Sequence, residues 1–101
     1  MQLSEAILAG SKLAPQAFGT LYDAQGGTCA LGAAAVIVAL EPEPVDGGLK
    51  ETFPILMETV DELPCGCPGG VPLVDAIVHL NDKHHWPREV IAKWVRSLER
   101  K

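Results

Sequence analysis

An unbroken run of apolar and glycine residues extends from Cys29 to Leu40 and limits the folds available to this chain. The run is too short to span a bilayer, for which about 20 apolar residues are needed. It is apolar on nearly every side, which is typical of a helix covered by other elements all round. We therefore predict a buried central helix here, with Thr28 as its N-cap.

The composition favours one helical domain over residues 1–101. Hydrophobic residues make up 48% of the chain, enough for one core, and only 5% are aromatic. The core must then come largely from Leu, Val, Ile and Ala, and small Ala side chains suit closely approaching helices. We predict a mainly α fold, a compact bundle of four to five helices, with either an irregular loop or a short β-hairpin near residues 16–28.

Apolar spacing and helix breakers predict the other elements. Further helices are expected at residues 3–13, 53–60 and 72–82 and from residue 87 onward, and breaker-rich loops at 41–48 and 64–70. Ser4 is the expected N-cap of the first helix, which Pro15 ends. In the last helix an apolar stripe predicts a largely buried Trp94; its members are Val90, Ile91, Trp94, Val95 and Leu98.

The net charge of −5 is unevenly distributed. Residues 1–82 have two basic and eleven acidic side chains, whereas residues 83–101 have six basic and two acidic ones. A pI near 5.0 argues against nucleic acid as the main partner and leaves an unknown protein partner or a homo-oligomer. The N-terminal residues lack the basic start and apolar stretch of a signal peptide, so a cytoplasmic location without membrane insertion is expected.

The segment at residues 79–95 contains the patterns His-Leu-Asn-Asp, His-Trp, Arg-Glu and Ile-Ala-Lys-Trp. It resembles a group of small bacterial and phage proteins for which no activity is established, and residues 10–16 and 27–33 are similar to upstream segments of that group. Members often have Ser or Thr where this chain has Pro87, which can start a helix but cannot cap it with a hydroxyl. The resemblance implies a common fold and a bacterial or mobile-element origin.

Cys65 and Cys67 flank one glycine in a breaker-rich loop, and His79, His84 and His85 follow. Two thiols and imidazoles could together form a tetrahedral zinc site. Zinc-binding cysteine pairs usually have two to four residues between them, however, so the spacing favours a tight turn with packed or redox-labile thiols. Zinc is therefore the alternative cofactor hypothesis.

Catalytic candidates are Cys29, His79 and Asp82. Cys29 starts the predicted central helix, where a nucleophilic thiol is one hypothesis, but no partner base can be located, and an inert buried thiol is expected. Asp75, His79 and Asp82 follow helical spacing, which predicts either an acid–base group or a hydrated polar face. We interpret residues 81–82 as structural, with Asn81 in a left-handed conformation and both side chains capping the last helix.

The last two predicted helices also have the outline of a helix-turn-helix, in which basic side chains would contact phosphates; these are Arg88, Lys93, Arg96, Arg100 and Lys101. Helical hairpins are far more common than DNA-binding motifs. The sequence therefore favours a small non-enzymatic interaction or accessory protein. The alternatives are a zinc-binding protein or a cysteine-dependent enzyme that uses Cys29, Cys65, Cys67 and the region of His79, and a nucleic-acid binder.

Overall fold

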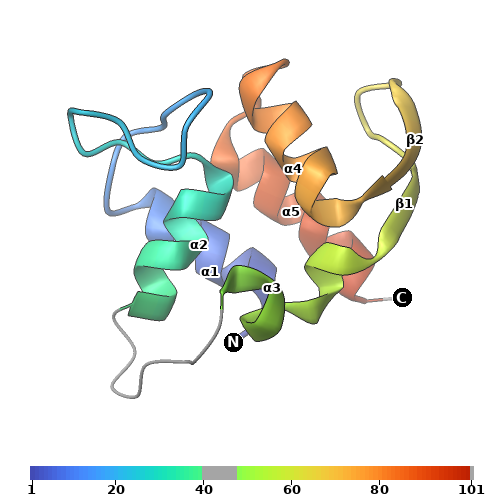
Figure 1. The fold of residues 1–101 in the computed structure, drawn as a ribbon, viewed down its shortest axis with the longest axis horizontal. Coiled ribbons are helices and arrows are strands. Elements are labelled where there is room, and N and C mark those ends of the chain that lie inside the picture. Colours follow the sequence, from blue (N-terminus) through green and yellow to red (C-terminus); the bar gives the residue numbers. More distant parts are fainter. Residues whose placement is uncertain (40–47, 101) are drawn as a thin grey trace.

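The computed structural model describes residues 1–39 and 48–100, and these form a mainly helical fold with one short β-hairpin (Figure 1). In chain order the elements are α1 (Leu3–Ser11), α2 (Ala30–Ala39), α3 (Leu49–Thr52), the 3₁₀ helix η1 (Pro54–Met57), β1 (Thr59–Glu62), β2 (Pro68–Pro72), α4 (Leu73–Asp82) and α5 (Arg88–Glu99). The predicted fold class is confirmed. Within the described residues, no helix is long and apolar enough to cross a membrane. The end of the predicted central helix at residue 40 and the predicted loop at 41–47 lie outside the described residues.

Helix α1 packs against α2 and α5, and small residues bring the first two helices into close contact. A Cβ atom at Gly10 would lie 2.1 Å from the carbonyl oxygen of Ala33, so only glycine permits this approach. The first half of α2 is buried, but residues 35–38 are half-buried and Ala39 is exposed. The prediction of a helix covered all round is therefore confirmed only for the first half of α2.

The apolar stripe of α5 is buried only in part. Ile91 and Val95 are completely buried, Trp94 and Leu98 are half-buried, and Val90 is exposed. The predicted burial of Trp94 is confirmed in part: its side chain packs against the core cluster but is not completely buried, and it borders a groove beside β1. The remaining fully buried large aliphatic side chains come from α1, η1 and α4 and are Leu3, Ile7, Leu56, Leu73, Ile77 and Leu80.

The β-hairpin lies at residues 59–72 and not near residues 16–28. Strand β1 pairs with β2 in antiparallel fashion, with Val60 opposite Val71 and a bulge before Glu62. The prediction of a helix at residues 53–60 is therefore wrong beyond Met57, because Val60 belongs to strand β1 and its buried side chain reaches the core from there. Residues 16–28 form an irregular loop in which isolated bridges join Gln16 and Tyr22 to Thr28. This loop lies at the opposite side of the molecule from the hairpin (Figure 1).

The tip of the hairpin is shaped by proline and glycine. Pro64 occupies the second position of a turn that the Gly66 N–H closes by donating to the carbonyl of Leu63 at 3.0 Å. Gly66 then adopts a φ of 85°, a left-handed conformation that glycine tolerates without strain. As a result Cys65 and Cys67, on either side of Gly66, are held at the tip of a tight turn.

Both ends of α1 are held by charged side chains of the antiparallel helix α5. The carboxylate of Glu99 accepts the backbone N–H and the hydroxyl of Ser4, and the guanidinium of Arg88 donates to the carbonyl of Ser11. An anion at a helix N-terminus and a cation at its C-terminus both stabilise the helix dipole. Ser4 is therefore not the N-cap as predicted; that position is Gln2.

Candidate metal centre

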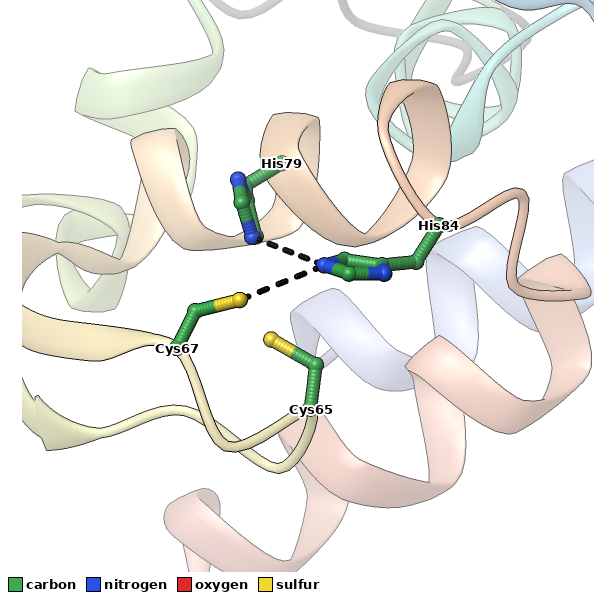
Figure 2. Close-up of side chains that lie close together, drawn as sticks. All are labelled: Cys65, Cys67, His79 and His84. Carbon is green, nitrogen blue, oxygen red and sulfur yellow. Dashed lines mark hydrogen bonds between the residues drawn. The ribbon is translucent and has the colours of Figure 1, made fainter.

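Four side chains from three parts of the fold meet beside the hairpin tip: Cys65, Cys67, His79 and His84 (Figure 2). The two cysteines come from the turn between β1 and β2, and His79 comes from the last turns of α4. His84 follows the end of α4 by two residues, where the chain turns toward α5. The cluster therefore joins the hairpin to the α4–α5 corner.

The ligand atoms of the cluster lie at distances that suit a single cation. All four lie within 4.8 Å of one another. The Nε2 atom of His84 is 3.1 Å from that of His79 and 3.3 Å from Sγ of Cys67. A tetrahedral zinc ion with its usual bond lengths separates its N and S ligand atoms by about 3.3–3.8 Å. Small side-chain movements would therefore complete a Cys₂His₂ tetrahedron.

Hydrogen bonding within the protein does not fully satisfy these groups. His84 Nε2 has two partners, Cys67 Sγ and His79 Nε2, but an imidazole nitrogen offers either one proton or one lone pair. The pKa of the Cys67 thiol is raised, first by its hydrogen bond with Cys65, then by burial and by the charge of a Cys65 thiolate. A bound cation would remove the competition for His84 Nε2 and the repulsion between two thiolates, because it coordinates the lone pairs of both imidazoles and of both thiolates.

His85, the fifth predicted ligand, does not join the cluster. It is the only non-glycine residue among those described with a positive φ, 51°. Its ring packs instead on Phe18, with the ring centroids 4.3 Å apart. The sequence could not separate His85 from His84, because the backbone turn at His85 decides which neighbouring ring faces the cysteines.

Cys29, predicted as a nucleophile or as an inert thiol, lies away from this cluster. Its buried Sγ accepts the Gly32 N–H at 3.3 Å, so Cys29 caps the start of α2, while the predicted cap Thr28 receives Arg88 instead. Burial raises the pKa of the Cys29 thiol and outweighs the opposing N–H groups of Gly32 and Leu31. This environment favours the neutral thiol, which is a poor nucleophile.

Cys29 should accordingly react slowly with a thiol reagent in the folded protein. We expect Cys65 and Cys67 in metal-free protein to react at least about tenfold faster than Cys29, whose thiol is both buried and protonated at neutral pH. Rates measured by mass spectrometry of labelled peptides test this expectation, and unfolding in denaturant should make the three rates similar. Rapid labelling of Cys29 in the folded protein would contradict it.

Asp75, His79 and Asp82 do not form an acid–base group. Asp75 is exposed, and His79 faces His84. Asp82 accepts the N–H of Gly19 at 2.9 Å and therefore holds the loop between α1 and α2. The acid–base hypothesis is not supported by these contacts.

The structural role predicted for residues 81–82 also differs from the contacts observed. Asn81 is buried in the last turn of α4 with helical geometry, so the predicted left-handed conformation is wrong. Its side chain contacts Gln16, Ala17 and Ala30 and not the start of α5. The sequence offered no direct signal for this contact between residues far apart in the chain.

Arg88, the first phosphate contact expected in the helix-turn-helix hypothesis, is not accessible to nucleic acid. Its side chain is only 5% exposed and donates to carbonyl groups of the protein itself. Lys93, Arg96 and Arg100 are exposed on α5, and Lys101 lies outside the described residues. The basic residues therefore do not form one continuous contact surface that includes the start of α5.

Comparisons of this chain with protein families, with curated proteins and with solved structures give no match. The resemblance of residues 79–95 to a bacterial and phage group therefore stays a prediction. The candidate metal centre is the part of the structure from which a function can be inferred.

Proposed function

We propose that this protein is a small, non-enzymatic zinc-binding module in which Cys65, Cys67, His79 and His84 hold one Zn²⁺. The observation that supports this most strongly is the convergence of four ligand atoms, all within 4.8 Å of one another, from segments separated in sequence. Thiolate and imidazole are the ligands that zinc prefers in structural sites. The four residues between His79 and His84 also fit the usual histidine spacing, although the cysteine spacing is shorter than usual.

A zinc ion at this place would have a structural role. A two-stranded hairpin is marginally stable by itself, and the ion would tie its tip to the α4–α5 corner. Four protein ligands also complete the tetrahedron, whereas a catalytic zinc keeps one position for water or substrate. The donor set therefore supports an accessory or interaction protein over a metalloenzyme, and the inert setting of Cys29 argues against a cysteine-dependent enzyme.

Cobalt(II) substitution tests the proposed ligands. Titration of metal-free protein with Co²⁺ should produce the intense visible bands of tetrahedral cobalt and a thiolate-to-cobalt charge-transfer band, saturating at one ion per chain. Equimolar Zn²⁺ should abolish both, since zinc binds such sites more tightly. Zinc at 100 times its dissociation constant should also stabilise the fold by about 2.7 kcal/mol.

Matched variants assign the ligands. Cys67→Ser should lower the thiolate-to-cobalt charge-transfer band by about half, because one of the two thiolates is lost, and His84→Ala should weaken Co²⁺ binding, because water replaces a protein ligand. Cys29→Ser and His85→Ala remove the same residue types from outside the cluster and should leave the spectrum unchanged. An octahedral spectrum in the native protein, or an undiminished charge-transfer band in Cys67→Ser, would refute the proposed site.

A further inference from the structure

A groove of about 730 Å³ runs between β1 and the C-terminal half of α5. Residues 58–64 form one wall, and Trp94, Ser97 and Leu98 form the other. Its volume lies within the range of about 300–1,000 Å³ that is usual for ligand-binding clefts. The groove is separate from the candidate metal centre, whose four residues do not line it.

The groove follows the free edge of β1. Every residue of β1 borders the groove, although successive side chains of a strand point to opposite faces. In contrast, no residue from 68 to 71 of β2 borders it. A groove lined in this way runs along the side of the strand that faces away from its partner. In the described residues β1 pairs with β2 alone, so backbone N–H and C=O groups on its other side are directed at the groove.

The charges of the lining favour a basic occupant. Glu58, Asp61 and Glu62 are exposed, and none of the described residues that line the groove is Lys, Arg or His. The opposite wall presents the half-buried indole of Trp94, a surface on which cationic or apolar side chains can pack. The lining thus combines a strand edge, negative charge and an aromatic surface.

We propose that this groove binds an extended, lysine- or arginine-containing peptide segment of a partner protein, which adds to β1 as a third strand. Backbone hydrogen bonds to β1 would provide affinity, and the carboxylates would select basic side chains. This interaction surface goes beyond the proposed zinc-binding function and does not require it, since its residues are different.

A synthetic peptide tests this surface directly. An eight-residue peptide of alternating lysine and valine should bind the zinc-supplemented protein with a dissociation constant of the order of 100 µM. In ¹H–¹⁵N spectra the largest shifts should fall on the amides of residues 59–62 and on the indole N–H of Trp94. A matched peptide with glutamate in place of lysine should not bind, because it would face the same carboxylates.

Three surface variants distinguish binding in this groove from non-specific electrostatic attraction between a basic peptide and an acidic protein. Ser97→Arg should weaken binding at least about tenfold by filling the groove with a cation. The double variant Asp61→Asn and Glu62→Gln should weaken binding about fivefold. Asp75→Asn removes one charge from an exposed position of α4, outside the groove, and should have less than about a twofold effect.

Three results would overturn the proposal. They are absence of binding to the zinc-supplemented protein, equal binding of the glutamate peptide, and shifts that do not involve residues 59–62. Concentration-dependent dimerisation of the protein that Ser97→Arg abolishes would instead assign the groove to a second copy of the chain and would equally reject a basic peptide as occupant.

Discussion

Arg88→Met should lower the free energy of unfolding by about 3–5 kcal/mol. The guanidinium is buried and donates to the carbonyls of Ser11, Ala14 and Thr28 and to the Thr28 hydroxyl. Burial lowers the pKa of Arg88, but a guanidinium stays protonated in proteins. Methionine fills similar space but removes the donor from the carbonyls of Ser11 and Ala14 and from the Thr28 hydroxyl, at about 1–3 kcal/mol for each group that stays buried. The Thr28 carbonyl keeps the N–H of Ala17 as a donor.

Urea unfolding of the two proteins measures this effect. Arg96→Met removes the same charge from an exposed position of the same helix and should change the free energy of unfolding by less than about 0.5 kcal/mol. Arg88→Lys should give an intermediate loss, because one ammonium group cannot reach acceptors on both sides of the guanidinium. A loss below about 1 kcal/mol in Arg88→Met would show that the guanidinium does not hold α1 and its following loop.

Asn81→Ala should lower the free energy of unfolding by about 2–4 kcal/mol. Its Oδ1 accepts from Gln16 Nε2 at 2.9 Å and from the Ala30 N–H at 3.2 Å. Its Nδ2 donates to the Ala17 carbonyl at 2.9 Å and to the Asp82 carboxylate at 2.8 Å. The amide thus connects α4, the start of α2 and the loop between α1 and α2, and alanine would leave buried backbone groups unpaired.

Two further variants define the role of the Asn81 amide. Asp82→Ala loses a half-buried carboxylate that binds the Gly19 N–H, and it should cost only about 1 kcal/mol. Asn81→Asp keeps the shape of the side chain but places a carboxylate oxygen, which cannot donate, beside the Ala17 carbonyl and the Asp82 carboxylate. It should therefore lower the free energy of unfolding at least as much as Asn81→Ala. Equal, small losses in Asn81→Ala and Asp82→Ala would contradict this account.

The last two helices could be predicted well because prolines mark their beginnings. Pro72 and Pro87 immediately precede α4 and α5, and the apolar spacing within each helix has the helical period. The hairpin could not be predicted in this way. Val60 fits a helical spacing as well as a strand spacing, and a segment with as few residues as β1 does not distinguish them.

The residue types of the candidate metal centre could be recognised from the sequence, but not their arrangement. The short cysteine spacing argued for a simple turn, and the turn at Gly66 is indeed present. What the sequence did not reveal is that β1–β2 pairing brings this turn to the end of α4, beside His79 and His84. The burial of Arg88 could not be predicted either, since the burial of a charge by distant carbonyl groups has no local signature in the sequence.

The metal content of the native protein tests the zinc-binding proposal most directly. The protein should be expressed without a metal-binding tag in zinc-supplemented medium, purified without chelator, and analysed by native mass spectrometry together with elemental analysis. We expect one zinc per chain in the native protein and in Cys29→Ser, and none in the double variant Cys65→Ser and Cys67→Ser. Native protein without zinc, or a double variant that retains it stoichiometrically, would contradict the proposal.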